Sequence, residues 1–294
     1  MPGIKKIIWA VDLFSEHKPL ERHGLKNISL FTKGLQTTIE PVSVFSAWQL
    51  PEPDAQYLQR VFKKDILEGA TLRGLKPVKL ITTQNLYPSS TNSEVHHLLK
   101  YAEKRKADLI VVHSTAQTGF SRLLMGSFAE TLINASPIPV FVINAHSKTP
   151  PKMTKIFFPS DGTKNCLKVF GEVVRAAKRL KAKVYTFNHV EISGYRLLRK
   201  AYPRSAELLE ELKQMAHKNI SDLESMAQKT GVPIVPLIEI SQTKHHEAIL
   251  RQCKKNGIHL IATTSQKGPL RAGMLGSVTR EVVRRAERPV WVLH

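Results

Sequence analysis

Cysteine is almost absent from this sequence, which contains two in 294 residues. Cys166 and Cys253 lie far apart and form neither a CxxC pair nor a spacing that is typical of metal ligands. A framework of disulfides is therefore excluded. We expect both thiols to be reduced and to serve as small residues of a core.

Long apolar runs are also absent. No stretch reaches the roughly 18 uninterrupted apolar residues that a membrane-spanning helix requires. The first apolar run ends at Asp12 and is too short for a secretory signal peptide. With 42% hydrophobic residues, the sequence indicates a cytoplasmic globular protein that is long enough for two domains.

The motifs of the common catalytic machineries are missing. The sequence has no Walker loop, no GxSxG elbow and no HExxH helix. Two adjacent histidine pairs, His96-His97 and His245-His246, are poor chelates because neighbouring residues on a helix point about 100° apart. We therefore expect neither an enzyme nor a metal site, and leave a weak ATPase activity open.

Acidic residues are few: 24 Asp and Glu stand against 44 Lys and Arg, for a net charge of +20. The excess is uneven, with +6 in residues 1–150 and +14 in residues 151–294. Such a charge attracts anionic partners, nucleic acid among them, with an affinity that salt weakens. An anionic partner is therefore one candidate for this protein.

The last expected helix carries a basic stripe, because Arg280, Arg284 and Arg288 recur in steps of four. Glu281 is placed to pair with Arg285 on the same helix. The simpler interpretation of the stripe is a solvated helix face. The alternative is an anion-binding surface.

What the sequence does contain is an internal repeat. "KKIIWAVD" ends at Asp12 and "TKIFFPSD" ends at Asp161, while "LLMGSFAETL" at 123–132 matches "GMLGSVTREV" at 273–282. In each half, short apolar runs typical of buried strands alternate with helical patterns. The repeat therefore predicts an α/β fold with two doubly wound, parallel five-stranded sheets in a flavodoxin-like order.

The periodicity also predicts where the helices and domains lie. The clearest helix ends before Gly231, which supplies a left-handed stop. The polar, proline-bearing segment 144–154 predicts a linker, so we expect domains at 1–147 and 152–294. The expected helices lie near residues 22–36, 54–73, 92–106 and 204–230.

The repeated residues indicate a ligand site. In a doubly wound sheet, ligands bind beyond the carboxyl ends of the strands, where neighbouring connections leave toward opposite faces. If the first and fourth strands are neighbours, the repeated Asp and the repeated Gly-Ser pair meet there, and the free backbone N–H groups of the last helix suit a phosphate. Helix capping is the alternative role for both features. The candidates are Asp12, Gly126 and Ser127 in the first half and Asp161, Gly276 and Ser277 in the second.

Each half resembles a universal stress protein domain, and the whole chain resembles a tandem member of that family. The resemblance is strongest in "LLMGSFAETLINASPIPVFVI" and "GMLGSVTREVVRRAERPVWVL". It implies that the closing strands "IPVFVI" and "PVWVLH" pair with each other and join the halves into an intramolecular pseudo-dimer. Further association into a homodimer is left open.

In the nucleotide-binding branch of that family, ATP is held by an Asp after the first strand and by a loop of the form G, two residues, G, nine residues, G, then S or T. In the first half, the two earlier glycines of that loop fall on His113 and Ala116. A Cβ at such a position opposes the close approach of the backbone to phosphates. The first loop therefore departs from the ATP-binding pattern.

The second loop departs from the pattern as well. Counted back from Gly276, the two glycine positions fall on Thr263 and Gln266. Aligned on the fourth strand instead, they fall on Thr264 and Lys267. Neither alignment restores a glycine pair.

The resemblance therefore implies a stress-response regulator that binds ATP, a related nucleotide or another small ligand at degenerate crevices and catalyses nothing. The second half is the better candidate because "SDGT" at 160–163 follows the family and because Lys267 and Gly268 could face an anion. The alternative is an anion-binding, nucleic-acid-binding or scaffold protein that has lost ATP binding.

Overall fold

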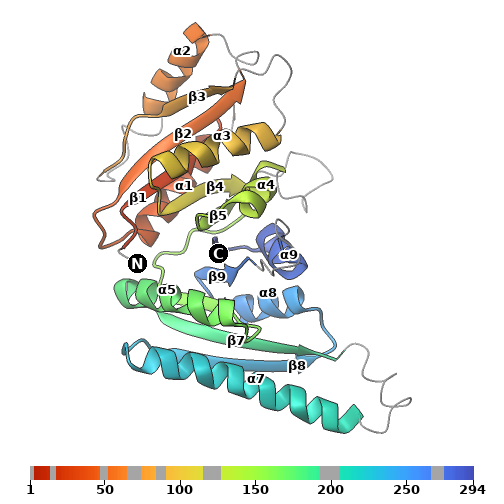
Figure 1. The fold of residues 1–294 in the computed structure, drawn as a ribbon. Helices are drawn as coiled ribbons and strands as arrows, with labels where there is room; N and C mark the ends of the chain where they lie inside the picture. The colour runs from red at the N-terminus through yellow and green to blue at the C-terminus, as the bar shows by residue number, and fades with distance from the viewer. Residues whose placement is uncertain are drawn as a thin grey trace.

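The protein is an alternating α/β chain with the same order of elements in both halves (Figure 1). This computed structural model describes residues 3–13, 18–46, 52–64, 74–83, 91–114, 127–192, 205–265 and 275–294. The first half contains β1 (Lys6–Ala10), α1 (Lys18–Phe31), β2 (Thr38–Ser46), α2 (Glu52–Phe62), β3 (Lys79–Thr83), α3 (Thr91–Lys104), β4 (Leu109–Ser114), α4 (Ser127–Ala135) and β5 (Val140–Asn144). The second half contains β6 (Lys155–Pro159), α5 (Lys164–Leu180), β7 (Lys183–Glu191), α7 (Ser205–Gln228), β8 (Ile234–Ser241), α8 (His245–Lys255), β9 (Leu260–Thr264), α9 (Ser277–Arg285) and β10 (Val290–Leu293).

The expected helices are present, with differences at their ends. The helix expected near 204–230 is α7, and Gly231 follows it with a φ of 71°, as its role as a left-handed stop requires. The helix expected near 22–36 begins earlier, at Lys18, and ends at Phe31. The helix expected near 54–73 is α2, which ends at Phe62, and the last residues of that expected range lie outside the described part of the chain.

The strands form one ten-stranded sheet in the order β3-β2-β1-β4-β5-β10-β9-β6-β7-β8. Within each half every strand pair is parallel, and β1 neighbours β4 as β6 neighbours β9, which confirms the expected flavodoxin-like order. The closing strands β5 and β10 pair antiparallel, with Trp291 opposite Phe141. The two expected sheets are therefore continuous, and the edges of both closing strands are paired.

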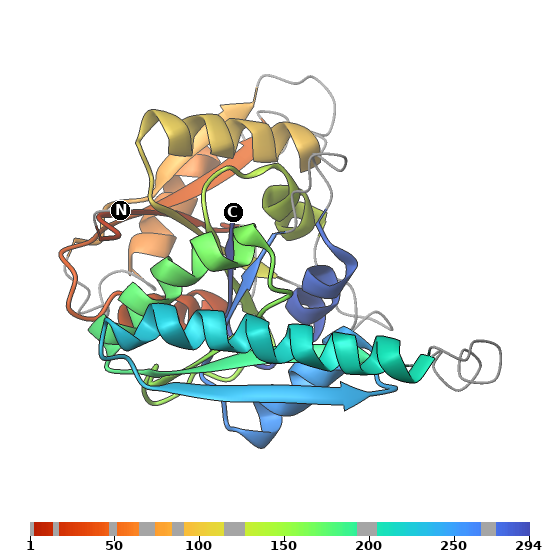
Figure 2. The ribbon, with the colours of Figure 1, turned by 60° about the horizontal axis from the view of Figure 1, so that its bottom comes forward.

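Helices cover both faces of this sheet (Figures 1 and 2). Apolar residues of α1, α5 and α7 form one core cluster with the sheet, and those of α3, α4, α8 and α9 form the other. The first cluster crosses the junction of the halves, because the Phe31 ring centroid lies 4.8 Å from that of Phe141 and 5.2 Å from that of Trp291. Arg179 of α5 donates hydrogen bonds to the carbonyl oxygens of Phe31 and Lys33, at 2.6 and 2.9 Å. The two halves thus share a buried interface.

The twist of the sheet determines how the two halves are oriented. Each strand is rotated by roughly 20–25° relative to its neighbour, and the rotation accumulates across the sheet. Although β5 and β10 run in opposite directions, β2 and β7 therefore point toward the same side of the molecule (Figure 1). The amino ends of these outer strands consequently share one side.

The arginine stripe of α9 faces the first half rather than solvent alone. Glu130 of α4 forms ion pairs with Arg280 at 2.8 Å and with Arg284 at 3.1 Å, and the three side chains are 22–35% exposed. Arg285 pairs with Glu281 at 2.9 Å, as the spacing predicts. The interpretation of the stripe as an open anion-binding surface is therefore wrong for its first two arginines, which already pair with carboxylates: Arg280 with Glu130, and Arg284 with Glu130 and Glu281.

Among the helices that the structure describes, none combines the length and the apolar character needed to cross a membrane.

Candidate functional site

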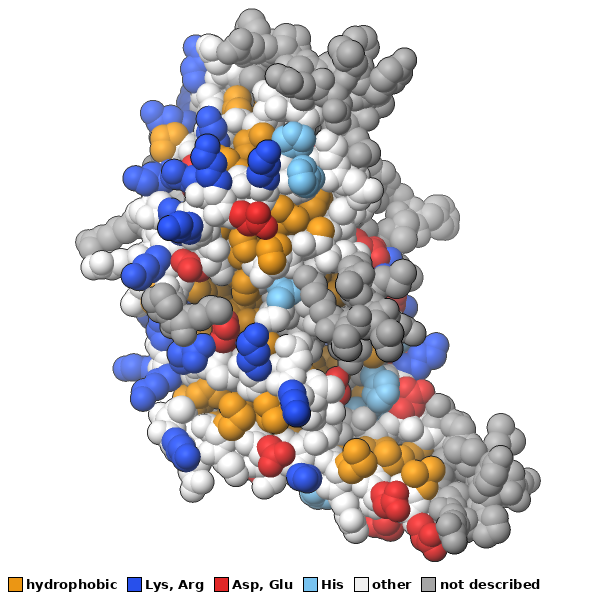
Figure 3. All heavy atoms as spheres, in the orientation of Figure 1, with side chains coloured by type: hydrophobic (Ala, Val, Ile, Leu, Met, Phe, Trp, Pro, Cys, Tyr) orange, Lys and Arg blue, Asp and Glu red, His pale blue; other side chains and the backbone are white. Residues whose placement is uncertain are grey.

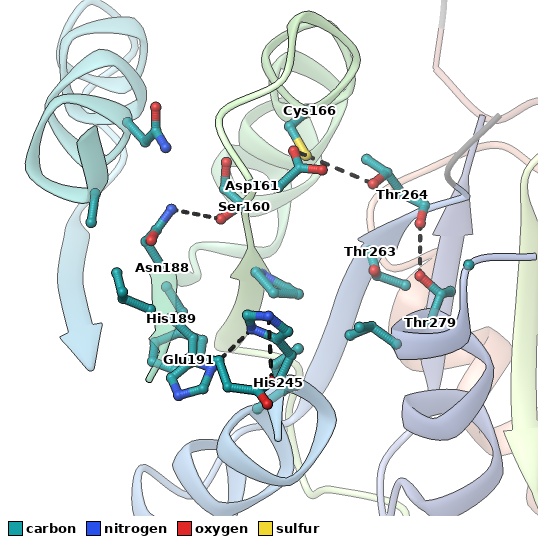
Figure 4. A pocket seen from close by; sticks show the side chains of 18 of the residues that line it. Ser160, Asp161, Cys166, Asn188, His189, Glu191, His245, Thr263, Thr264 and Thr279 are labelled. Carbon is teal, nitrogen blue, oxygen red and sulfur yellow. Dashed lines mark hydrogen bonds and ion pairs between the residues drawn. The ribbon is translucent and has the colours of Figure 1, made fainter. Parts of the chain in front are cut away.

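A cavity of about 460 Å³ lies in the second half, at the carboxyl ends of β6, β7 and β9 (Figure 4). The start of α9 closes one side of the cavity, and α7 closes another. This is the position that a doubly wound sheet offers to a ligand. Its polar lining includes Ser160, Asp161, Cys166, Asn188, His189, Glu191, Asn219, His245, Thr263, Thr264 and Thr279.

The segment "SDGT" places a carboxylate at the mouth of this cavity. Asp161 is exposed, and its Oδ1 accepts from the Thr163 N–H and from the Cys166 thiol, both at 3.0 Å. Gly162 has a φ of 74°, and a Cβ added there would stand 2.1 Å from Oδ1 of Asn219. Glycine is therefore required at 162 both by the turn and by the approach of α7.

The start of α9 presents backbone donors to the cavity. Gly276 lines the cavity and is the N-cap of α9, and because glycine has no side chain it does not cap the first turn. By contrast, the start of α5 is capped by Thr163, whose side chain accepts from the Cys166 N–H at 3.3 Å. Because the first N–H groups of a helix have no partner within the helix, the start of α9 suits an anion. Ser277 is the first residue of α9, and its side chain is exposed.

The first glycine of the family's loop falls on Thr263 in one alignment and on Thr264 in the other. Both residues belong to strand β9. Both are nearly buried and line the cavity. Thr279 of α9 donates to the Thr264 carbonyl oxygen at 3.0 Å, which fixes the helix against the strand. On the other side, the Cys166 sulfur lies 3.7 Å from Thr264 Oγ1, and burial raises the pKa of the Cys166 thiol, so the thiol remains a proton donor to Asp161.

His189, His245 and Glu191 form a second polar end of the cavity (Figure 4), and hydrogen bonds continue from His189 to residues behind it. Ser241 Oγ donates to Glu239 at 2.9 Å, so it accepts from His189 Nε2 at 3.0 Å. Burial, and next the neighbouring His245, lower the pKa of His189, whose ring is therefore neutral at pH 7. Its Nδ1 then accepts from His245 Nδ1 at 2.9 Å, and His245 Nε2 lies 3.6 Å from the Glu191 carboxylate. This end of the cavity thus offers both an imidazole and a carboxylate.

Helix α7 supplies an apolar wall to the same cavity. Leu212, Met215 and Ala216 all line it. The Met215 side chain is 60% exposed and Ala216 is buried, so this wall extends from the core to the surface. A flat apolar group of a ligand would find contact area here, between the two polar ends.

The first half supports this site across the junction. Asn134 of α4 accepts from the Leu275 N–H, one residue before Gly276, at 2.5 Å. Glu130 of α4 holds two arginines of α9, as described above. Helix α4 therefore positions the segment that leads into the start of α9.

In the first half, the larger side chain of His113 stands at the position that Thr264 holds in the second half. His113 of β4 is partly buried, with its Nε2 atom fully buried, and its ring centroid lies 6.1 Å from that of Trp9 in an edge-on arrangement. A Cβ added to Gly24 of α1 would stand 2.5 Å from His113 Nε2 and 3.2 Å from Trp9. Burial, followed by the nearby charge of His23, lowers the pKa of His113 to about 3, so the ring is neutral at physiological pH.

The structure describes five of the seven predicted site residues. Asp161 and Gly276 line one cavity, and Ser277 adjoins it at the start of α9. In the first half, Asp12 is exposed after β1, and Ser127 is the first residue of α4. Gly126 and Gly268 lie outside the described residues, as do Ala116, Gln266 and Lys267.

Several lining residues were not predicted from the sequence. His189, Glu191 and Asn219 lie on a strand and a helix with no local motif, and only the sheet order brings them to the cavity. The sequence marks His113 only as a position where the family's loop has glycine. The mid-helix glycine Gly24 was the available signal that a bulky group faces α1.

The histidine pairs show no metal chelation geometry. The rings of His96 and His97 are perpendicular, with centroids 5.9 Å apart, and His245 contacts His189 and Glu191. Within the described ranges, no three His, Cys, Asp or Glu side chains are grouped so that they could hold a metal ion.

Comparison with known proteins agrees with the repeat and the fold. The universal stress protein family matches the chain twice, over residues 3–144 and 153–294. The chain belongs to the universal stress protein family. Its two matches place both halves in that family, in tandem.

Individual proteins and solved structures are also similar to this chain. Universal stress protein MJ0531 of Methanocaldococcus jannaschii is 43% identical over 53 residues, which is 18% of this chain and 31% of that protein. A universal stress protein structure from Archaeoglobus fulgidus has a TM-score of 0.64 at 18% identity, covering 98% of this chain and 95% of its own. Protein PA1789 of Pseudomonas aeruginosa, described as functionally unknown, has a TM-score of 0.66 at 12% identity, covering 99% and 92%. At these identities the solved structures support the tandem fold.

Proposed function

We propose that this chain is a non-catalytic stress-response regulator that binds one nucleotide, ATP or a related compound, in the cavity of its second half. The observation that carries the proposal is that Asp161 and the uncapped start of α9 line the same cavity. A carboxylate suits the hydroxyl groups of a ribose, and free helix N–H groups suit phosphates. The two predicted features of the repeat thus meet where a nucleotide would need them.

The rest of the cavity supports the same assignment. Its volume of about 460 Å³ lies within the range of roughly 300–1,000 Å³ that is typical of small-molecule sites. Leu212 and Met215 offer an apolar wall to a base, and His245 and Glu191 offer polar contacts beyond it. Phosphates, ribose and base would thus have distinct surroundings.

We expect the nucleotide to bind in the second half only. In the first half, His113 and Trp9 stand where Thr264 and Phe158 stand in the second, and Gly24 packs against the imidazole. We therefore expect one ligand per chain.

The residues that line the cavity support binding without catalysis. Hydrolysis of a nucleotide requires a positioned base or water and metal ligands. Asp161 and Glu191 are the carboxylates in the lining that the structure describes, and Oδ1 of Asp161 already accepts two hydrogen bonds. These residues support the role of a sensor, a protein whose stability or contacts change when a ligand occupies its cavity.

Titration calorimetry and thermal unfolding with ATP test this proposal. ATP at 100 times its dissociation constant should raise the free energy of unfolding by about 2.7 kcal/mol, with one site per chain. Asp161→Asn keeps the acceptor for Thr163 but removes the charge, so it should weaken binding by about tenfold, the effect of about 1.4 kcal/mol.

Asp12→Asn is the matched control, because Asp12 ends the equivalent strand of the first half. It should leave the affinity unchanged. An unfolding temperature that stays flat at millimolar ATP would remove the nucleotide from the proposal. A stoichiometry of two, or equal losses in both variants, would remove its restriction to the second half.

A further inference from the structure

Lysine side chains gather on the side of the molecule opposite the carboxyl ends of the outer strands. They lie where helices end and strands begin, in both halves. In Figure 3 the Lys and Arg side chains follow the margin on which β2, β7 and β8 begin in Figure 1. We call this surface the lysine margin and define it by Lys104, Lys106, Lys178, Lys181, Lys183 and Lys229, all of them exposed.

The charges of the lysine margin are not neutralised by neighbours. None of its six lysines forms an ion pair within the described part of the chain. Of the nearby carboxylates, Asp108 accepts from the backbone N–H groups of Lys5 and Lys6, at 2.8 and 2.9 Å, and Glu103 is exposed beside Lys104. The margin is therefore a cationic surface, separate from the cavity at the other ends of the strands.

Two of these lysines occupy backbone positions that favour glycine. Lys106 and Lys181 have φ values of 54° and 52°, and they are the non-glycine residues with positive φ among the described residues. By strand register the second half carries Gly257, with a φ of 58°, at the position of Lys106, and the longer connection from α1 to β2 in the first half contains Gly34, with a φ of 82°. A side chain at a left-handed position costs backbone energy that glycine does not. At Lys106, then, a lysine stands where the other half has glycine, and Lys181 holds a second left-handed position that glycine would adopt without strain.

We propose that the lysine margin binds the phosphate backbone of double-stranded nucleic acid without reading its sequence. A row of unpaired lysines that spans both halves matches a regularly spaced polyanion. Single strands are bound through aromatic side chains on which bases stack, and the exposed large aromatic residue of the described chain, Tyr57, lies on α2 outside the margin. Insertion into a membrane surface requires apolar side chains, whereas Leu208, Leu212 and Met215 lie at the other end of α7.

The test is fluorescence anisotropy of a labelled duplex of about 20 base pairs and arbitrary sequence, in 50 and 200 mM salt. We expect binding at 50 mM salt and an affinity roughly a thousandfold weaker at 200 mM. The double variant Lys106→Gly/Lys181→Gly should weaken binding by about tenfold and make the dependence of log affinity on log salt shallower by about two. Because glycine relieves both left-handed positions, its unfolding temperature should rise by about 2–5 °C.

The control is Lys164→Gln/Lys244→Gln, which removes the same charge from two exposed positions at the cavity end of the second half. It should change duplex affinity by less than about twofold. Equal weakening in both variants would mean that net charge alone acts, and would overturn the margin as the site. No duplex binding at 50 mM salt, or binding to vesicles containing phosphatidylserine in place of the duplex, would overturn the proposed partner. None of these outcomes depends on whether ATP binds in the cavity.

Discussion

His113 and Thr264 occupy the same position in the two halves, four residues beyond the start of the fourth strand. The registers show this equivalence, because Ile7 pairs with Leu109 as Ile156 pairs with Leu260. In the first half the imidazole fills the space against Gly24. In the second half the smaller threonine lines a cavity of about 460 Å³. The comparison teaches that the residue at this strand end differs in size and in what it contacts: His113 packs against α1, whereas Thr264 lines a cavity.

The packing around His113 carries a cost in stability. Among the residues of the first half that the structure describes, Nε2 of His113, Nε1 of Trp9 and Oε2 of Glu21 are buried and find no hydrogen-bond partner. Each buried polar atom that loses water without gaining a partner costs about 1–3 kcal/mol. In the second half, Thr264 and Asp161 are hydrogen-bonded at the edge of the cavity. The packing of His113 against α1 therefore lowers the stability of the first half.

Gly24→Ala should show the largest effect, because the new Cβ would stand 2.5 Å from the His113 ring. In an open helix, glycine to alanine stabilises by about 1 kcal/mol. Here we expect the opposite sign, a loss of about 2–3 kcal/mol, since the buried imidazole and Trp9 leave no room. Denaturant unfolding monitored by circular dichroism measures this change.

Gly171→Ala in α5 is the matched control in the second half. Its Cβ would meet its nearest neighbour, Arg175, at 3.7 Å, which is ordinary contact. This variant should be stabilised by about 0.5–1 kcal/mol. Stabilisation of both variants would mean that His113 does not pack against α1 as described.

A buried carboxylate also distinguishes the halves. Burial, followed by repulsion from Asp12, raises the pKa of Glu21 to about 8. The folded state therefore keeps a proton that the unfolded state releases above pH 4.5, so this contribution is complete below 4.5 and is lost as the pH rises through 8. Below pH 6.5 the depressed pKa of His113 opposes this trend, since protonation of the unfolded state lowers stability there.

The window for observing Glu21 is therefore pH 6.5 to 8. Across it we expect the free energy of unfolding to fall by about 2 kcal/mol, and Glu21→Gln should flatten the fall. Glu172→Gln, on the equivalent helix α5, should leave the slope as it is, because Glu172 is partly exposed. Chemical denaturation at several pH values compares the three proteins. A slope that survives Glu21→Gln would assign the titration to another group.

Much of the fold was predictable from the sequence, because the repeat supplied the same pattern twice. The buried strands that end at Asp12 and Asp161, and the helix that stops at Gly231, follow from apolar periodicity and a glycine at a left-handed position. The pairing of β5 with β10 came instead from the family resemblance. The structure added that this pairing makes one continuous sheet.

The candidate site was predictable only in part. Asp161 and Gly276 recur with the repeat and could be placed at strand ends. His189, Glu191 and Asn219 carry no periodic signal, since their position depends on the order of strands and on how α7 crosses the sheet. The arginines of α9 were misinterpreted because charge spacing along a helix does not show that Glu130 approaches from the other half.

The smallest predicted effect tests whether the first half positions the cavity of the second. Asn134 accepts from the Leu275 N–H at the entry to α9. Asn134→Ala should leave this donor without its partner, a cost of about 1 kcal/mol, and should speed hydrogen exchange at residues 275–279 by roughly fivefold. If ATP binds at the start of α9, its affinity should fall by a similar factor.

Asn144→Ala separates positioning from general loosening of the same helix. The Asn144 side chain donates to the carbonyl oxygens of Val283 and Ala286, at 2.7 and 2.9 Å, so it supports the opposite end of α9. Its loss should speed exchange near residues 286–288 and change ATP affinity less than Asn134→Ala does. If the two variants instead affect the start of α9 equally, the helix responds as one rigid unit, and the first half supports the cavity through overall stability rather than through the contact at Leu275.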